Sequence, residues 1–293
     1  MKVACGWLYT LNRYGYPPSY EGVLAGIDKA AEWGFDAFEM EAIGEENLHL
    51  LDGRRQEILD RIRGAGLSLV NFVPMLPDMV SLHQPRRERA LDLFRLGAEL
   101  GAFLGAQMMM CDSYEVPLSY IGEAPGTDPL HYGKSYRVKV TGDFSWDRVW
   151  ENLVAVIGRC TEIAAESRLR LGMELRMGEA VSNTDAFLRL YGAVGNPNLG
   201  VVFDTAHLHA QKEILPLSVE KLKDRIFLIH ASDNDSRENR HLALDQGTID
   251  WAAVYRALQK HRFDGYTVLD IGDCPDLEEG YLASKLYLQN LVI

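Results

Sequence analysis

Short apolar segments recur along the chain, and each is followed by a stretch with helical periodicity. Near-continuous apolar runs of this kind are typical of parallel strands that are buried on both faces. The runs are KVACGWLY, FDAFEMEA, LSLVNFVPM, AQMMMCD, LRLGMELR, LGVVFDTAH, RIFLIHASD and YTVLDIG. Eight such strands alternating with eight helices predict a (β/α)8 barrel of the α/β class.

Residues that commonly begin helices stand where this pattern places helices. Ser19 and Ser145 precede amphipathic stretches, and Asp250 precedes WAAVYRALQKH, so each can accept a hydrogen bond from a first helical turn. Pro85 suits the first turn of the helix after the third apolar run. A doubly wound open sheet is the alternative, but no glycine-rich nucleotide loop follows the first run. The barrel is therefore the preferred fold.

One connection is much longer than the others. Residues 114–144 read YEVPLSYIGEAPGTDPLHYGKSYRVKVTGDF, rich in proline, glycine and tyrosine. A long connection inside a compact barrel is usually a lid, a binding loop or an oligomer contact. Because this insertion follows the fourth strand, we expect it to cover the mouth of the barrel or to form a subunit contact in a homo-oligomer, a dimer or a tetramer. We expect residues 1–293 to form a single barrel domain that includes it.

Length, charge and cysteine content narrow the class of protein. A single barrel needs about 250 residues, and the chain has 293. Its net charge of −12 disfavours nucleic acid and anionic membranes as partners. The four cysteines form no C-x-x-C pair, no apolar run nears the roughly 18 residues of a membrane span, and no signal peptide is evident. These features predict a cytoplasmic protein that acts on a small molecule.

Polar residues end four consecutive predicted strands: Glu174, Asp204, His230 and Asp270. The carboxyl ends of barrel strands hold the chemistry, and neighbouring ends lie close together. Three carboxylates crowded there would repel unless a cation neutralised them. Taken singly, Asp204 could cap a helix, His230 could be a core histidine, and Glu174 could pair with Arg176. Taken together they favour one divalent ion, Mn²⁺ first, with Co²⁺, Zn²⁺ or Mg²⁺ as alternatives.

Several segments together resemble a known family. LGMELR, GVVFDTAHLHA, LIHASDNDSRENRHLALDQGTIDW and GYTVLDIG, with GFDAFEMEA earlier, are similar to the xylose-isomerase-like TIM barrel superfamily over nearly the whole chain. That group contains sugar isomerases, ketose 3-epimerases, inosose dehydratases and class II apurinic endonucleases. The resemblance implies that Glu174, Asp204, His230 and Asp270 bind the metal. It also implies that His207 faces the substrate.

The resemblance further implies an isomerase or epimerase of a sugar or polyol. Such enzymes remove a proton alpha to a carbonyl and pass through an enediolate, which a metal ion helps to stabilise. Glu174 and Asp270 are the expected proton-transfer groups, with His207 as a further catalytic residue. The family usually has glutamate where this chain has Asp270. The shorter side chain could leave Asp270 as a metal ligand but not as a proton shuttle. Asp273 is nearby and is an alternative for that role.

Other residues are candidate substrate contacts, each with an ordinary structural alternative. Arg237, or Arg240 in its place, and His241 lie in the charged segment after the seventh strand, which could equally be a solvated loop. Arg176 follows Glu174 closely. Trp7 either forms an apolar wall for a sugar face or plugs the barrel.

Three further functions compete with the isomerase or epimerase. An inosose-type keto-sugar dehydratase would use the same site and the same enolate chemistry. A phosphodiesterase like the apurinic endonucleases is disfavoured by the net charge and by Asn239, which stands where those enzymes are expected to have aspartate. A sugar-binding barrel without catalysis remains if Asp270 does not act as a base.

Overall fold

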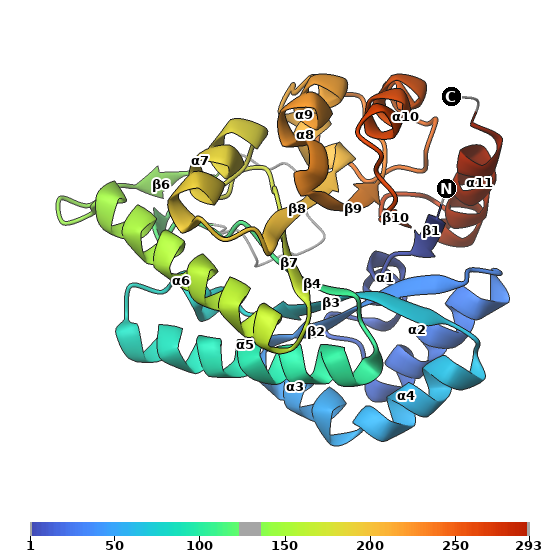
Figure 1. Cartoon of the computed structure of the whole chain (residues 1–293), viewed down its shortest axis with the longest axis horizontal. Coiled ribbons are helices and arrows are strands. Elements are labelled where there is room, and N and C mark those ends of the chain that lie inside the picture. Colours follow the sequence, from blue (N-terminus) through green and yellow to red (C-terminus); the bar gives the residue numbers. More distant parts are fainter. Residues whose placement is uncertain (1, 123–135, 292–293) are drawn as a thin grey trace.

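The computed structural model describes residues 2–122 and 136–291. Eight parallel strands close into a barrel in the order β1-β10-β9-β8-β7-β4-β3-β2, and helices surround it (Figure 1). The strands are β1 (Lys2–Cys5), β2 (Ala37–Ile43), β3 (Ser68–Met75), β4 (Met108–Cys111), β7 (Arg170–Glu174), β8 (Leu199–Asp204), β9 (Ile226–Ala231) and β10 (Tyr266–Leu269). The predicted (β/α)8 fold is confirmed.

The helices follow the strands along the chain. They are α1 (Leu8–Tyr14), α2 (Tyr20–Glu32), α3 (Gly44–Gly53), α4 (Arg55–Gly64), α5 (Gln84–Leu104), α6 (Trp146–Glu166), α7 (Thr184–Val194), α8 (Thr205–Ala210), α9 (Leu215–Leu222), α10 (Trp251–Lys260) and α11 (Leu277–Asn290), with short 3₁₀ turns η1 (Pro77–Val80) and η2 (Lys223–Arg225). No helix in the described part of the chain is long and apolar enough to cross a membrane.

The predicted helix starts are confirmed. The hydroxyl of Ser19 accepts a hydrogen bond from the Gly22 amide at 3.1 Å, and the side chain of Asp250 accepts one from the Ala253 amide at 2.9 Å. Ser145 caps α6 in the same way. These contacts satisfy backbone amides that have no partner within the helix.

The first apolar run is shorter as a strand than its composition indicates. β1 ends at Cys5, and Trp7 is already the N-cap of α1, which begins at Leu8. The chain turns at Gly6, where a Cβ atom would lie 2.2 Å from the carbonyl oxygen of Leu269 on the neighbouring strand. α8 likewise begins directly after β8. Apolar periodicity alone does not separate a short buried strand from a buried helical turn.

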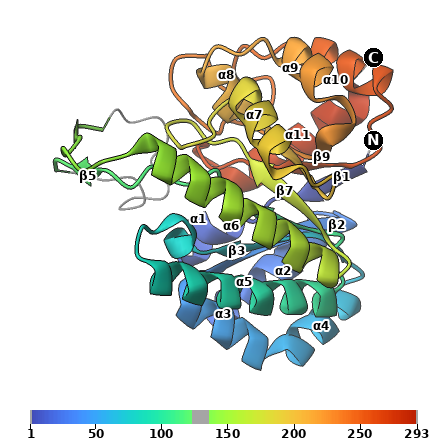
Figure 2. The ribbon, with the colours of Figure 1, turned by 60° about the vertical axis from the view of Figure 1, so that its left-hand side comes forward.

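The insertion after β4 contains an antiparallel hairpin of β5 (Ser119–Tyr120) and β6 (Val138–Lys139). The rings of Tyr120 and Tyr136 meet edge to face there, with centroids 6.0 Å apart. Figure 2 shows β5 projecting to the side of the barrel. Residues 123–135 of the insertion lie outside the described residues, so its predicted role as a cover or subunit contact stays a prediction.

A separate apolar cluster fills the barrel below the functional side chains. Strand residues point alternately to opposite faces, so the residue two positions later shares the same face. Val202, Leu228 and Val268 belong to this cluster, and each stands two residues before a predicted site residue. On β7 the corresponding position is Gly172, where a Cβ atom would lie 2.6 Å from the Met108 side chain. The cluster therefore forms the floor of the polar site.

Candidate active site

Three of the four predicted metal ligands converge at the carboxyl ends of adjacent strands. Nδ1 of His230 lies 2.6 Å from Oε1 of Glu174 and 4.0 Å from Oδ2 of Asp204. One potential ligand atom from each residue lies within 4.8 Å of the others, and all three residues are buried. The strand register accounts for part of this, because Asp204 on β8 pairs directly with His230 on β9. An imidazole and two carboxylates in this arrangement are a common divalent-cation donor set.

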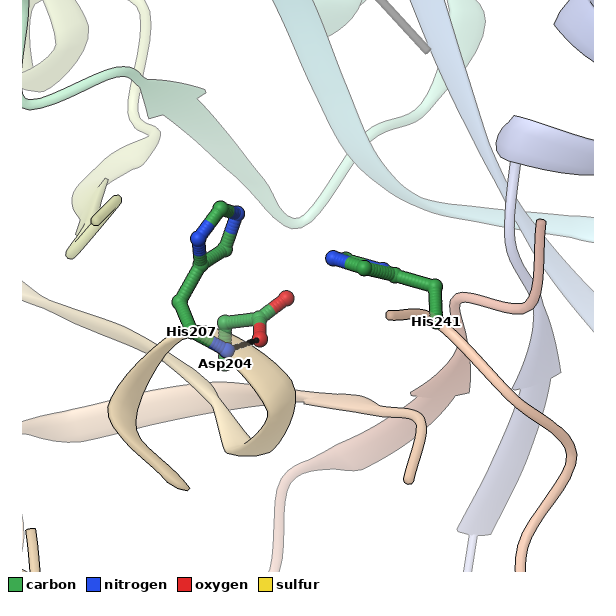
Figure 3. A group of neighbouring side chains, drawn as sticks. All are labelled: Asp204, His207 and His241. Carbon is green, nitrogen blue, oxygen red and sulfur yellow. Dashed lines mark hydrogen bonds between the residues drawn. The ribbon is translucent and has the colours of Figure 1, made fainter. Parts of the chain in front are cut away.

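Asp204 leaves one oxygen without a partner. Its Oδ1 accepts a hydrogen bond from the His207 amide at 2.8 Å and so caps α8 (Figure 3). Its Oδ2 is buried and has no hydrogen-bond partner among the described residues. Burial raises the pKa of Asp204 to about 7. A buried carboxylate oxygen without a donor is costly unless a cation lies beside it, so the donor set fits a divalent ion.

The carboxylate of Glu39 orients the imidazole of His230 through its Nε2 atom. This Nε2 lies 2.9 Å from Oε2 of Glu39, which also accepts a hydrogen bond from the side-chain nitrogen Nδ2 of Asn71 at 2.5 Å. Burial alone would lower the pKa of His230, but Glu39 and Glu174 together raise it well above its ordinary value. A carboxylate on one ring nitrogen is the usual way to orient a metal-binding histidine through the other. Nδ1 is thereby directed at Glu174 and Asp204.

The sequence analysis did not identify Glu39 and Asn71 as site residues. Glu39 lies in the quoted segment GFDAFEMEA, and its position as an acid inside a buried strand was the available signal. Its partner His230 is 191 residues away in the sequence. Only closure of the barrel brings the two strands face to face, so spacing along the chain does not reveal the contact.

Asp270 lines the same cavity but lies outside the Glu174–Asp204–His230 cluster. Its Oδ2 accepts a hydrogen bond from Nδ1 of His241 at 3.0 Å. Burial would raise the pKa of Asp270, but the hydrogen bond from His241 and the charge of His230 lower it. Asp270 is therefore a carboxylate held by a histidine, and its role as fourth ligand stays a prediction.

His207 enters the cavity in a defined tautomer. Its Nδ1 lies 3.1 Å from the Met177 amide and 2.9 Å from the side-chain nitrogen of Asn239, both of which are donors. Nδ1 must then be the acceptor, and the proton of the neutral ring resides on Nε2. Burial and then His241 lower the pKa of His207 well below its ordinary value. His207 is thus a neutral hydrogen-bond donor, as its predicted contact with a substrate oxygen requires.

His207 also belongs to a second group of potential ligands. Asp204, His207 and His241 each offer an atom within 4.8 Å of the others. Figure 3 shows the rings of His207 and His241 on either side of the Asp204 carboxylate. The ring centroids are 5.3 Å apart, at an interplanar angle of 79°. Asp204 is thus common to both groups and lies at the centre of the polar layer.

The cavity above this layer is acidic. The residues that line it are Leu8, Leu11, Tyr16, Glu41, Met75, Met110, Asp112, Glu174, Arg176, His207, His230, His241 and Asp270. Arg176 is the single lysine or arginine among these described lining residues, and carboxylates surround it. Its Nη1 lies 3.2 Å from Asp112 and 3.7 Å from Glu179, and its Nε lies 3.7 Å from Glu174. Its positive charge is therefore already compensated.

Two predicted substrate contacts lie away from the cavity lining. Arg237 is exposed, and its amide donates to the side chain of Asp235 at 2.9 Å. Trp7 is buried in the core, with its ring centroid 6.2 Å from that of Phe38, which matches the plug alternative. The proposed substitute base Asp273 pairs with Arg240 at the surface, 2.5 Å away. Any substrate contact by Arg237 or Trp7 stays a prediction.

The loop after β9 is folded by buried hydrogen bonds that carry Asn239 and His241 into the site. Asp233 accepts hydrogen bonds from the Ile249 amide at 3.2 Å and from the Trp251 indole at 3.0 Å. A Cβ atom on Gly247 would lie 2.2 Å from the same carboxylate. The segment GTIDW therefore surrounds Asp233: two of its residues donate hydrogen bonds to that carboxylate, and its glycine leaves room for it.

Comparisons with known proteins agree with this architecture. The family model described as xylose isomerase-like TIM barrel matches residues 27–291. An uncharacterised protein of Methanocaldococcus jannaschii is 22% identical over 277 residues, which cover 92% of this chain and 86% of that protein. An inosose dehydratase of Lacticaseibacillus casei is 26% identical over 163 residues, covering 48% of this chain and 54% of the enzyme.

A solved structure shares the fold over the whole length. D-psicose 3-epimerase from Clostridium cellulolyticum, in a structure with D-tagatose, superposes with a TM-score of 0.77 at 15% identity, and the match covers 99% of each chain. At this identity the likeness concerns the arrangement of the backbone.

Proposed function

Because the chain belongs to the xylose isomerase-like TIM barrel family, we propose that it is a divalent-metal-dependent isomerase or epimerase of an uncharged sugar or polyol. One observation supports this most directly. The cluster of Glu174, Asp204 and His230 lies at the carboxyl ends of three adjacent strands and contains a buried, unpartnered oxygen of Asp204.

Glu174, Asp204 and His230 would hold the ion, with Asp270 as the proposed fourth ligand. When bound, the ion supplies positive charge that stabilises the negative charge developing on a substrate oxygen beside the carbonyl. Mn²⁺ is the first candidate, since the set mixes carboxylates with a single imidazole. Glu39 keeps the imidazole of His230 in place for this task.

Glu174 is the proposed base. It removes the proton from the carbon next to the carbonyl, and the electrons of that C–H bond form the enediolate of the substrate. His207 donates its Nε2 proton in a hydrogen bond to a substrate oxygen, because Met177 and Asn239 occupy Nδ1. Return of a proton to the same carbon from the other face gives an epimer, and return to the neighbouring carbon gives an isomer.

The acidic cavity supports an uncharged substrate. A phosphate group would need a cation with spare charge, and Arg176 already faces Asp112, Glu174 and Glu179. We therefore place free ketoses, inososes and related polyols ahead of sugar phosphates.

A dehydratase is the second candidate, favoured by the similarity to inosose dehydratases. It shares the first step, but the enolate then expels a hydroxide from the next carbon. Mass spectrometry separates the two, because a dehydratase product is lighter by one water and an epimer is not.

The test is a panel of ketoses and inososes incubated with the Mn²⁺-loaded protein in deuterium oxide. We expect deuterium to enter at the carbon next to the carbonyl in at least one compound. Loaded protein that binds a sugar and exchanges no proton would instead make the chain a sugar-binding barrel. Abasic DNA is included in the panel, and cleavage of it would support the phosphodiesterase.

A further inference from the structure

We propose that Glu41 is the acid that returns a proton to the substrate from the side of the cavity opposite Glu174. This inference rests on the proposed function and adds a second proton-transfer residue to it. Glu41 lies on β2, two residues after Glu39, so both side chains point to the inside of the barrel. Glu39 contacts His230, and Glu41 lies one step nearer the mouth, in the cavity lining.

The strand order places Glu41 across the cavity from the metal cluster. In the closed barrel β2 and β8 are separated by β1, β10 and β9 on one side and by β3, β4 and β7 on the other. Asp204 is on β8, and Glu174 is on the adjacent β7, which β4 and β3 separate from β2. A substrate held near Asp204 and Glu174 therefore presents its other face to β2. Glu41 is the cavity-lining acid on that strand.

Glu41 differs from the other acids of the cavity in having no polar partner. Within residues 2–122 and 136–291, no hydrogen bond or ion pair involves its carboxyl group. Asp112 is bound to Arg176, Glu174 to His230, and Asp270 to His241. The cost of a partly buried carboxyl without a partner is offset when a substrate hydroxyl or carbon accepts its proton.

The electrostatic surroundings favour the acid form of Glu41. Burial raises the pKa of Glu41 well above its ordinary value, and the surrounding carboxylates, Glu39 first, add to the rise. Asp270 has the opposite character, because His241 holds it as a carboxylate. Asp270 is thus poorly suited to deliver a proton, whereas Glu41 has a raised pKa and can carry the proton that Asp270 lacks.

The proposed transfer balances. Glu174 takes the proton from the carbon, and the electron pair of that bond becomes the C=C bond of the enediolate. The O–H of Glu41 then breaks, and its proton joins the same carbon from the opposite face, using the electron pair of the C=C bond. The configuration inverts. Glu174 is left protonated and Glu41 ionised, and exchange with water restores both before the next turnover.

The experiment compares inversion with proton exchange in deuterium oxide, using Glu41→Gln and Glu174→Gln in the Mn²⁺-loaded protein. In Glu41→Gln, Glu174 can still remove the proton and return a deuteron to the same face. We expect exchange to stay within a few-fold of wild type while inversion falls roughly 10²-fold or more. Glu174→Gln should lose both. Glu41→Asp, which retains an acid, should recover part of the inversion, and the exposed Glu46→Gln should behave as wild type.

Two outcomes would overturn the assignment. Inversion at the wild-type rate in Glu41→Gln excludes Glu41 as the donor. If Glu41→Gln loses inversion and exchange equally while its metal content and fold are unchanged, Glu41 only positions the substrate and is not the proton donor. If the wild type exchanges no proton with any sugar, the proposed function fails instead. Glu41 is then judged by infrared spectroscopy, since the difference between wild type and Glu41→Gln must contain the carbonyl band of a protonated carboxyl at neutral pH.

Discussion

The side-chain nitrogen of Asn239 lies 2.9 Å from Nδ1 of His207. The Met177 amide also donates a hydrogen bond to the same nitrogen, at 3.1 Å. An aspartate in place of Asn239 would accept a hydrogen bond and would require a proton on Nδ1, where the Met177 N–H already points. The asparagine that departs from the endonuclease pattern is therefore matched to a histidine that donates from Nε2.

Asn239→Asp should disturb this tautomer. We expect the carboxylate to draw the proton of His207 to Nδ1 and to raise the pKa of the ring, because a negative charge beside an imidazole favours its charged form. The nitrogen chemical shifts of the ring report the tautomer directly. Asn239→Ala removes the donor without adding charge and serves as the control. Identical shifts in wild type and Asn239→Asp would contradict the proposed tautomer.

His207→Ala and Glu174→Gln should have separate effects. Loss of one hydrogen bond to the substrate costs about 1 kcal/mol, so His207→Ala should raise KM roughly fivefold while metal content is unchanged. Glu174→Gln should reduce proton exchange by about 10²-fold or more, because an amide ligates but does not accept the proton. Steady-state kinetics and metal analysis of both variants provide the check. Proton exchange at the wild-type rate in Glu174→Gln would show that another group is the base.

Glu39→Gln should weaken metal binding although Glu39 is not one of the proposed ligands, because it contacts the cluster through Nε2 of His230. The amide loses the charge that orients and polarises His230, and losses of about 10–100-fold in affinity are typical for such partners. Calorimetric titration with Mn²⁺ measures this, and the exposed Glu46→Gln is the matched control. Equal affinity in Glu39→Gln and wild type would show that Glu39 only fills space beside the ring.

The barrel fold and the central residues of the site could be predicted from the sequence for one physical reason. Buried parallel strands read as apolar runs, and a polar residue at the end of such a run, as at Asp204 or His230, stands out against them. Glu39 lacks this signal because it lies within its run, and Asn239 lacks it because it lies in a charged loop. Glu39 acts through a contact across the closed barrel, and Asn239 through a contact between the loop after β9 and α8. Their roles depend on which strands and loops meet, which local patterns do not encode.

The metal-free protein should lose stability as the pH rises from about 4 to above 7. Asp204 ionises near its ordinary pKa of 3.8 when unfolded, but burial raises its pKa to about 7 in the folded protein. Between these values the folded state binds more protons than the unfolded state, so the free energy of unfolding falls as pH rises. His230, whose pKa is also raised, acts in the same direction up to its folded pKa. Glu179, whose pKa burial raises to about 8, adds to this trend. His207 opposes it below pH 6.5, because its pKa is lowered from that ordinary value, and Asp270, with a lowered pKa, opposes it only at more acidic pH.

Thermal unfolding with and without Mn²⁺ tests this dependence. The stabilisation by Mn²⁺ should be larger at pH 8 than at pH 5, because the ion replaces the protons that Asp204 and His230 carry in its absence. Asp204→Asn removes one of the two titrating groups and should flatten the curve of the metal-free protein. A metal-free protein that grows steadily more stable from pH 5 to pH 8 would contradict the assignment.

The charge around Arg176 leads to a prediction about substrate choice. Asp112 is its nearest carboxylate, at 3.2 Å, and Glu179 and Glu174 follow at 3.7 Å. A phosphate entering the cavity would meet these carboxylates before it gained the guanidinium, so kcat/KM for a ketose should exceed that for its phosphate ester. Asp112→Asn removes the nearest competitor and should narrow the difference, whereas the exposed Asp224→Asn should leave it unchanged. Kinetics on matched pairs of ketose and ketose phosphate measure the ratio. A wild-type preference for the phosphate ester would mean that Arg176 exchanges its protein partners for the substrate, and the uncharged-substrate proposal would then be wrong.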